Sequence, residues 1–364
     1  MNQTTESVKD KTGSIFEGED IILKVRDLHT YFFTDLGVAR ALNGVNFDIP
    51  RGKVMGVVGE SGCGKSVTAL SIMRMVAKPG KIVKGDIQYF RRKFGPDGKE
   101  FNEAINLTKL EGMGPEMRSI RGAQMSMIFQ EPMTSLNPSY TIGDQIMEAI
   151  ILHQKVDEVE AEKRAVAILD GVGMANPKLI VKRYPHELSG GMRQRAMISL
   201  ALSCTPAVLF ADEPTTALDV TTEAQILDLM RELQANINMT IVFITHNLGV
   251  VAQMCDYVSV MYLGRVVEQA PVDDIYYNPK HPYTSSLLRS IPHVGSGQKE
   301  RLQPIRGVVP DPYSKIKGCP FHPRCDQAMR GLCDVKVPGL TMVDKGHSVR
   351  CFLHSDVEEE SNGQ

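Results

Sequence analysis

Short apolar runs alternate with amphipathic stretches between residues 22 and 270 of the chain. A strand that is buried on both faces of a parallel sheet has this apolar composition. Three runs fit it best, namely KVMGVVG at 53–59, AVLFADE at 207–213 and TIVFITH at 240–246. Apolar residues at helical spacing predict helices at 64–76, 190–203 and 221–236. The alternation of the two patterns predicts an α/β fold with a mostly parallel sheet.

The rest of the chain is more polar and divides it into regions. Residues 91–114 are rich in turn formers and predict a hairpin with a surface excursion. After about residue 275 the sequence becomes rich in proline and irregular, which indicates a domain boundary. We therefore expect four regions, which are a solvated tail at 1–20, a main domain at 21–275, a small C-terminal domain at 276–354 and an acidic tail at 355–364.

Composition excludes several classes of protein. The 41 basic and 43 acidic residues nearly balance, so bulk charge does not indicate a nucleic-acid binder. The first 20 residues lack the apolar segment of a signal peptide. The longest apolar runs are far too short to cross a bilayer. We expect a soluble chain that stays in the compartment where it is made.

The stretch GESGCGKS, from Gly59 to Ser66, carries the strongest chemical signal. It fits the pattern G-x-x-x-x-G-K-[ST] and stands between a predicted strand and a predicted helix, the context of a phosphate-binding P-loop. Its glycines let backbone N–H groups surround phosphate oxygens, and Lys65 would reach the β- and γ-phosphates. The expected nucleotide-binding residues of this stretch are Gly59, Ser61, Gly62, Cys63, Gly64, Lys65, Ser66 and Val67.

A second signal comes from the run at 207–213, which ends in Asp212 and Glu213. The end of a parallel strand brings both acids to the sheet edge where ligands bind in open α/β sheets. One acid would hold Mg²⁺ together with Ser66, and the other could polarise an attacking water. An acidic pair after a strand is often only a turn, but the P-loop upstream favours the catalytic interpretation.

At this point the chain resembles the ATP-binding-cassette (ABC) ATPases. LSGGMRQR at 188–195 is similar to their signature motif, and ALD at 217–219 to their D-loop. ITHN places His246 as the switch histidine, and MIFQEP places Gln130 as the Q-loop glutamine. Met192 departs from the usual glutamine of the signature, and we expect little consequence. The resemblance spans residues 22–270 and implies a P-loop α/β domain with a helical subdomain.

The resemblance also implies roles for these residues. Two cassettes of this family enclose two ATP molecules, and Ser189, Gly190 and Gly191 contact the ATP held by the partner. Glu213 would be the general base, His246 would hold the γ-phosphate, and Gln130 would join Ser66 at Mg²⁺. Asp212 and the D-loop residue Asp219 complete the nucleotide site. Phe32 is expected to stack on the adenine, with Tyr31 as second choice and core packing as the alternative.

Two functions compete for such a cassette. It could energise a membrane transporter, or it could be a soluble ATPase that acts in translation or on nucleic acid. One P-loop, one signature and no sustained heptads favour the transporter subunit. The segment 131–150 would then receive the coupling helices of separate membrane proteins, although a buried helix is the alternative interpretation.

The C-terminal part narrows the resemblance. NPKHPYTSSLLRSIP at 278–292 and GCPFHPRC at 318–325 are similar to the tail of oligopeptide and dipeptide importers, in particular their D-type ATPase. This implies a peripheral protein at the cytoplasmic face of the membrane. Its partners would be a second ABC ATPase, two membrane permeases and an extracytoplasmic binding protein, with no nucleic acid. Close relatives carry nickel chelates or sugars, so the cargo stays open.

Four of the seven cysteines, Cys319, Cys325, Cys333 and Cys351, fall in this last part. In a reducing cytosol such a cluster indicates metal or catalysis before disulfides. The paired spacing of structural zinc sites is absent, and so are the ferredoxin spacings, so spacing alone leaves the ligand open. The resemblance implies a [4Fe–4S] cluster, with zinc as second choice and unligated thiols as the third. We expect nucleotide binding to survive the replacement of Cys325, because the P-loop lies in the other domain.

The remaining cysteines and histidines carry plainer expectations. Cys204 and Cys255 follow helical patterns and are expected to be small buried residues. His322, His347 and His354 lie near the four cysteines. Since four thiols suffice for a metal site, we expect these histidines at the surface.

Overall fold

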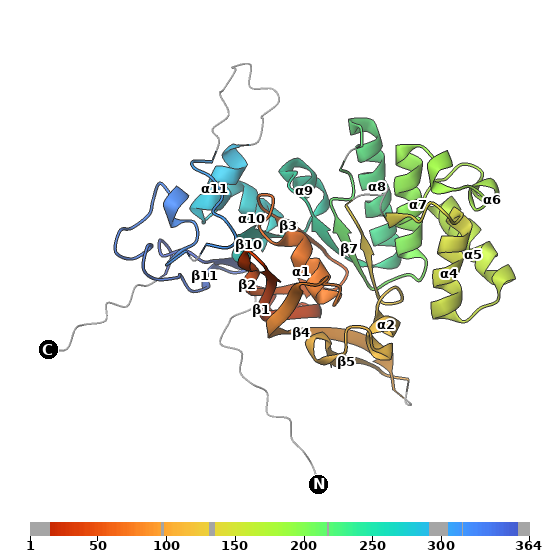
Figure 1. The fold of residues 1–364 in the computed structure, drawn as a ribbon, viewed down its shortest axis with the longest axis horizontal. Helices are drawn as coiled ribbons and strands as arrows, with labels where there is room; N and C mark the ends of the chain where they lie inside the picture. Colours follow the sequence, from red (N-terminus) through yellow and green to blue (C-terminus); the bar gives the residue numbers. More distant parts are fainter. Residues whose placement is uncertain are drawn as a thin grey trace, which may run out of the picture.

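The computed structural model describes residues 15–95, 98–130, 135–216, 218–290, 305–314 and 316–355. Five predictions fall partly outside this range: the N-terminal tail, the acidic tail, the start of the segment 131–150, Ala217 of the D-loop and the end of the 278–292 stretch. The described chain folds into two sheets flanked by helices (Figure 1).

An eight-stranded sheet forms the centre of the molecule, with the strand order β11-β12-β10-β9-β3-β8-β7-β6. Its strands are β3 (Val54–Val58), β6 (Met125–Ile128), β7 (Val208–Asp212), β8 (Thr240–Ile244), β9 (Tyr257–Tyr262), β10 (Arg265–Pro271), β11 (Thr341–Asp344) and β12 (His347–Val349). From β6 to β9 neighbouring strands are parallel, and the remaining pairs are antiparallel. The predicted α/β fold and its three central strands are confirmed.

Alternate residues of these strands enter two different cores. In β8, Ile241 and Phe243 belong to one apolar cluster, whereas Val242 and Ile244 belong to the other. Successive side chains of a strand point to opposite faces, so a strand covered on both faces must be apolar throughout. The consecutive apolar residues in the sequence therefore report a sheet that is buried on both sides.

The second sheet is antiparallel, with the strand order β2-β1-β4-β5. Its strands are β1 (Ile21–Thr34), β2 (Gly37–Pro50), β4 (Gly80–Phe94) and β5 (Glu100–Asn106). The pairing of Phe94 with Glu100 closes β4 and β5 into a hairpin, so the hairpin predicted at 91–114 is confirmed. The short η1 (Leu107–Lys109) and α2 (Pro115–Ile120) follow it.

Helices occupy both ends of the central sheet. Figure 1 shows α4, α5, α6 and α7 grouped at one end of the molecule, with the C-terminal elements at the opposite end. This group comprises α4 (Ile142–Gln154), α5 (Glu158–Gly171), α6 (Pro177–Ile180), η2 (Pro185–Glu187) and α7 (Gly190–Leu202). The other helices are α1 (Lys65–Ile72), α8 (Val220–Ile237), α9 (Leu248–Met254), α10 (Val272–Tyr277), α11 (Pro282–Arg289) and η3 (His322–Arg324).

The C-terminal hairpin β11–β12 extends the central sheet, because β12 pairs with β10 at Glu268 and Gln269. Glu268 is fully buried and accepts hydrogen bonds from His347 Nε2 at 2.8 Å and from the His281 backbone at 2.9 Å. The prediction of His347 as a surface residue is wrong, since it is fully buried. A neighbouring carboxylate lets an imidazole enter the core by supplying its hydrogen bond.

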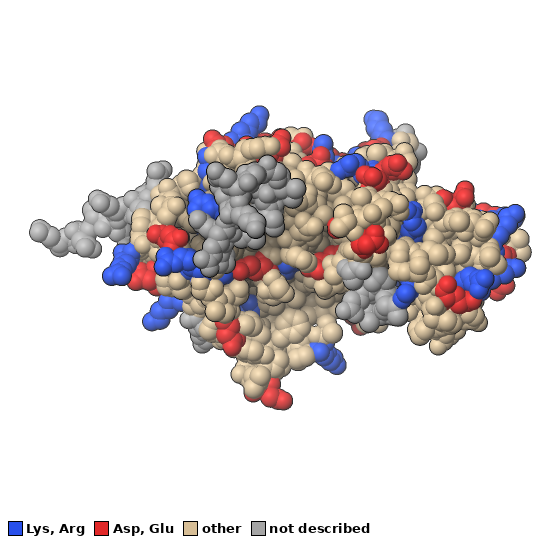
Figure 2. Space-filling view, turned by 90° about the horizontal axis from the view of Figure 1, so that it is seen from above, with Lys and Arg blue, Asp and Glu red and all other residues tan. Residues whose placement is uncertain are grey.

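The surface carries charges of both signs. On the face shown in Figure 2, basic and acidic side chains are interspersed. None of the helices in the described ranges is long and apolar enough to cross a membrane.

Candidate functional site

The loop between β3 and α1 has a backbone that only glycine accommodates at two positions. Gly59 and Gly64 have φ angles of +149° and +105°. A Cβ at Gly59 would lie 2.2 Å from the Met261 carbonyl, and one at Gly64 would lie 2.6 Å from the Ala41 carbonyl. Both glycines are therefore required by backbone packing, which holds the loop tightly at the start of α1.

Lys65 lies within this loop and is buried. Its ammonium donates to the Gly59 carbonyl at 2.9 Å and to the Glu60 carbonyl at 3.2 Å. A buried ammonium needs such partners, and carbonyl oxygens are weaker partners than phosphate oxygens. The loop thus holds the Lys65 ammonium where phosphate oxygens can replace its two carbonyl partners.

Ser66 connects the loop to the acidic strand end, because its hydroxyl donates to Asp212 Oδ1 at 3.0 Å. Asp212 is buried, and burial raises the pKa of its carboxyl. A hydroxyl oxygen and a carboxylate oxygen at this separation are hard ligands of the kind Mg²⁺ prefers. The two residues fit a magnesium site beside the phosphate loop.

Glu213 is the centre of a hydrogen-bond network at the same sheet edge. Its carboxylate accepts from His246 Nδ1 at 2.8 Å, from Thr216 Oγ1 at 2.9 Å and from Gln130 Nε2 at 3.1 Å. Burial acts to raise the pKa of Glu213, but the hydrogen bonds from His246 and Thr216 outweigh it and lower the pKa. The carboxylate is therefore ionised at neutral pH and can accept a proton.

Four segments far apart in the sequence thus meet at one edge of the sheet. This arrangement of a phosphate loop, a magnesium pair and an ionised carboxylate is suited to cleaving a nucleoside triphosphate. The ABC transporter family matches residues 42–216, and the oligopeptide/dipeptide transporter C-terminal region matches residues 267–333.

Curated relatives match over nearly the whole chain. The oligopeptide transport ATP-binding protein AppD of Bacillus subtilis is 47% identical over 94% of this chain and 99% of its own length. A probable peptide ABC transporter ATP-binding protein of Sinorhizobium fredii is 47% identical over 93% and 96% of the two chains. The chain belongs to the ATP-binding proteins of ABC transporters. It is an ABC ATPase.

A solved structure agrees with the fold of this ABC ATPase. The dimeric structure of MJ0796, a bacterial ABC transporter cassette, is 25% identical and superposes with a TM-score of 0.58. The superposition covers 69% of this chain and 99% of that cassette. The part of the chain outside this superposition is about as long as the two expected tails and the expected C-terminal domain combined.

The signature residues Ser189, Gly190 and Gly191 lie at the start of α7. Ser189 caps α7 by accepting the Met192 N–H at 3.4 Å, and both Ser189 and Gly190 are exposed. Asp219 caps α8 in the same way through the Thr222 N–H at 3.0 Å. The backbone of Gly191 lies next to the Thr222 side chain, so the two helix starts are neighbours. Exposed N–H groups at the start of α7 can donate hydrogen bonds to a phosphate that is bound by another chain.

Tyr31 and Phe32 are neighbours on β1 and therefore face opposite sides of the small sheet. Tyr31 lies under the Arg40 guanidinium at 5.7 Å from the ring centroid and contacts His29 Nδ1 at 3.1 Å. The ring of Phe32 lies over the backbone of Gly80, where a Cβ would come within 2.7 Å. Both rings are half-buried, and only one of them can face a given base.

The sequence did not reveal two residues that contact the phosphate loop, Arg324 and Tyr283. The Arg324 guanidinium pairs with the Glu60 carboxylate at 2.6 and 3.0 Å, and the Glu60 N–H donates to Tyr283 Oη at 2.9 Å. The cysteine segment therefore contacts the P-loop, because Arg324 directly precedes Cys325. That nucleotide binding survives the loss of Cys325 stays a prediction. A separation of 264 residues left no periodicity or spacing that could reveal the contact.

The structure does not support the predicted metal site. The described residues contain no group of three or more His, Cys, Asp or Glu that could hold a metal ion. Burial, with smaller contributions from neighbouring thiols, raises the pKa of Cys351 to about 11, and burial also raises the pKa values of Cys319 and Cys325. The donor set is soft and sheltered, as a cluster requires, but its placement does not form a site.

The other cysteines and histidines also differ in part from expectation. Cys63 and Cys255 are buried as small core residues, whereas Cys204 is only half-buried. His322 and His354 are half-buried as well, and each contacts a backbone carbonyl, at 2.8 and 3.0 Å respectively.

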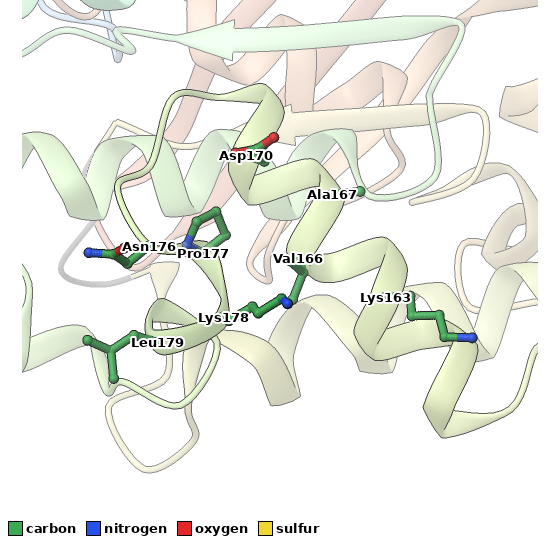
Figure 3. Close-up of a pocket in the computed structure, with 8 residues that line it drawn as sticks. All are labelled: Lys163, Val166, Ala167, Asp170, Asn176, Pro177, Lys178 and Leu179. Carbon is green, nitrogen blue, oxygen red and sulfur yellow. The ribbon is translucent and has the colours of Figure 1, made fainter.

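A separate hollow of about 600 Å³ lies in the helical group (Figure 3). Its lining comes from α5 and the start of α6 and consists of Lys163, Val166, Ala167, Asp170, Asn176, Pro177, Lys178 and Leu179. It has none of the residues that surround Glu213, so it is not part of the ATP site.

Proposed function

We propose that this ABC ATPase lies at the cytoplasmic face of the membrane and energises the uptake of di- or oligopeptides. The observation that carries the proposal is the match of residues 267–333 to the oligopeptide/dipeptide transporter C-terminal region. Relatives whose names state oligopeptide and dipeptide transport align over more than nine-tenths of this chain. These relatives do not favour the alternative of a soluble ATPase in translation or on nucleic acid.

In this proposal Glu213 is the general base of ATP hydrolysis. Its ionised carboxylate accepts a proton from the attacking water, and His246 and Thr216 keep it ionised and oriented. Glu213 has a positive φ of 47°, a backbone conformation that a side chain seldom adopts. The strain is tolerated because the Glu213 N–H donates to the Ile244 carbonyl at 2.8 Å, which holds the turn in place.

Lys65 and Ser66 act on the phosphates. Lys65 exchanges its carbonyl partners for β- and γ-phosphate oxygens, since a charge-assisted hydrogen bond is the stronger one. Ser66 and Asp212, with Gln130 beside them, would hold Mg²⁺, which would neutralise phosphate charge. Phe32, or Tyr31 as second choice, stacks on the adenine. His246 moves from Glu213 to the γ-phosphate when ATP is present.

The partners follow from the exposed signature residues and from the groove near Gln130. Ser189, Gly190 and Gly191 meet the ATP of a second ABC ATPase, as in the dimeric arrangement named for MJ0796. A hollow of about 730 Å³, lined by methionines such as Met73, Met113 and Met197, lies next to Phe129. Flexible methionine side chains fit a helix from a permease, so one of the two membrane permeases docks here.

Transport by the reconstituted complex tests the proposal. The chain would be combined in proteoliposomes with its partner ATPase, both permeases and the binding protein. We expect di- or oligopeptides to stimulate ATP hydrolysis and to accumulate inside the vesicles. Nickel chelates and sugars serve as competing cargoes, and stimulation by one of these instead of peptides would contradict the peptide assignment.

The four cysteines are proposed to bind a [4Fe–4S] cluster, with zinc as the alternative. Only the donor chemistry supports this, because Cys319, Cys325 and Cys333 lie close enough to Cys351 to contribute to its raised pKa. Iron and zinc analysis of anaerobically purified protein tests it. About four irons per chain are expected for the cluster. Stoichiometric zinc without iron would favour the alternative, and metal-free protein with an ordered C-terminal segment would contradict both.

A further inference from the structure

The phosphate loop carries a negative charge that its task does not require. Glu60 is the second residue of the loop, and its side chain is 24% exposed. An anionic carboxylate at this position would repel the triphosphate that the loop binds. It would also compete for Lys65, whose ammonium already donates to the Glu60 carbonyl. Something must neutralise Glu60 for the loop to bind ATP well.

Arg324 provides that neutralisation from the C-terminal region. Its two terminal nitrogens donate to the two oxygens of Glu60 at 2.6 and 3.0 Å, in the bidentate geometry that suits a carboxylate. The side chain of Arg324 is 4% exposed. Its Nε donates to the Arg306 carbonyl at 2.8 Å, and its guanidinium lies 5.9 Å from the centroid of the Tyr262 ring. These contacts hold the guanidinium in one position.

A second contact holds the backbone of the same residue. Tyr283 of α11 accepts the Glu60 N–H at 2.9 Å and is fully buried. Its ring packs against Tyr262 and Phe321 at centroid distances of 4.7 and 5.3 Å. The aromatic group anchors both Tyr283 and the turn that carries Arg324. The side chain and the N–H of Glu60 are thus turned toward the C-terminal region.

The C-terminal region also touches the hairpin next to the proposed adenine stack. Tyr313 Oη lies 3.2 Å from Thr34 Oγ1, and the Pro312 carbonyl accepts the Arg40 N–H at 3.3 Å. These contacts involve β1, which carries Phe32 and Tyr31, and its neighbour β2. One region therefore reaches both the phosphate side and the base side of the nucleotide site.

We infer that Arg324 is a positioning residue of the ATP site, which neutralises Glu60 and keeps it away from the bound phosphates. The C-terminal region is then part of the nucleotide site. Displacement of the turn at Arg324 releases the Glu60 carboxylate toward the phosphates and weakens ATP binding. The inference rests on ATP binding by this chain and does not depend on the cargo that the transporter carries.

The test measures the dissociation constant of ATP for the full-length chain in four forms. Arg324→Ala is expected to raise this constant about tenfold, because it leaves the carboxylate unpaired. Glu60→Gln alone is expected to change it less than about threefold. The double variant is expected to return to within about threefold of the parent, since the repelling charge is gone. Arg330→Ala is the control, because Arg330 is an exposed arginine of the same region.

Rescue distinguishes positioning from loss of folding. A chain that unfolds in part has fewer active sites and a lower kcat, and adding Glu60→Gln would not restore it. If Arg324→Ala does not fold, Arg324→Lys keeps the charge without the bidentate contact and should show a smaller loss that Glu60→Gln also relieves. Parent-like ATP binding by a folded Arg324 variant, or a double variant no better than Arg324→Ala, would overturn the inference. Failure of peptide transport with this rescue intact would concern the cargo alone.

Discussion

Glu213 shows how single residues define the chemistry of the site. It directly follows Asp212, yet the two carboxyl groups have opposite environments. Burial raises the pKa of Asp212, whereas hydrogen bonds from His246 and Thr216 lower the pKa of Glu213 despite its partial burial. Two acids with opposite shifts are suited to different tasks. Asp212 is placed beside Ser66 for metal binding, and Glu213 remains available as a base.

Replacement of this base should separate catalysis from binding. Glu213→Gln keeps the size of the side chain and one acceptor oxygen but cannot take a proton. We expect kcat for ATP hydrolysis to fall at least about 100-fold in the assembled transporter, with ATP still retained. Filter binding and phosphate release would measure the two effects. Glu232→Gln, at an exposed position of α8, is the matched control. Hydrolysis near the parent rate would show that Glu213 is not the base.

Lys65 should behave in the opposite way. Its ammonium is held by two carbonyl groups and is available to the phosphates. Lys65→Ala removes charge-assisted hydrogen bonds worth about 1.5–3 kcal/mol. The ATP dissociation constant should therefore rise between about tenfold and about 150-fold. Equilibrium binding of ATP at constant salt would measure it, with the exposed Lys163 changed to Ala as control. Unchanged affinity would remove Lys65 from the phosphate site.

At the scale of elements, a group of buried polar residues connects β10, β12 and α11. We call Glu268, His281 and His347 the latch. Glu268 accepts hydrogen bonds from the backbone of Lys280 and His281 and from the side chain of His347. His281 is itself buried and accepts the Tyr283 N–H at 3.0 Å through Nδ1. Because Nδ1 accepts, the imidazole is neutral there. Burial lowers the pKa of His281 from 6.5 to about 4.

This latch should make stability depend on pH. The unfolded chain takes up a proton at His281 near pH 6.5, whereas the folded chain resists it until about pH 4. Stability is therefore complete above pH 6.5 and falls as the pH drops. Between pH 7 and pH 5 the loss should be about 2 kcal/mol. The lowered pKa of Glu268 adds its own loss only at lower pH, below the ordinary value of 4.5.

Urea unfolding would measure this loss through tyrosine fluorescence, since the chain has no tryptophan. His281→Asn keeps an acceptor for the Tyr283 N–H but cannot be protonated in this range. We expect the variant to lose most of the pH dependence between pH 7 and pH 5. The exposed His186, changed to Asn, serves as the control. An equally steep dependence in His281→Asn would place its origin elsewhere.

At the scale of the whole molecule, our proposal divides the ATP site between two surfaces. The phosphate loop, Asp212 and Glu213 form one hydrogen-bonded group. Ser189 and Gly190 are exposed at the start of α7, and α7 belongs to the helical group at one end of the molecule (Figure 1). A helix N-terminus that is open to solvent can complete a phosphate site on another chain.

The isolated chain should therefore hydrolyse ATP poorly at low protein concentration. Adding the partner ATPase and the membrane subunits should raise the specific activity at least about tenfold, because the second half of each site is then supplied. Steady-state phosphate release across a range of protein concentrations would measure it. A monomer with full activity that does not depend on concentration would favour a self-sufficient ATPase.

The sequence by itself determined the α/β fold, the central strands and the family. These features are local or follow a fixed order along the chain: a doubly buried strand is apolar throughout, and a phosphate loop needs its glycines within eight residues. The sequence also named Gln130 and His246, which the structure joins to Glu213. Their roles in hydrolysis, the domain boundaries and the choice between Phe32 and Tyr31 stay predictions.

Only the tertiary structure decided how the C-terminal region is attached. The contact of Arg324 with Glu60 and the burial of His347 against Glu268 both depend on segments that are distant in the chain. Charged and polar residues in such segments look like surface residues in the sequence, because their partners are not neighbours at any regular spacing. Folding supplies those partners, and a polar side chain becomes a buried one only once it has them.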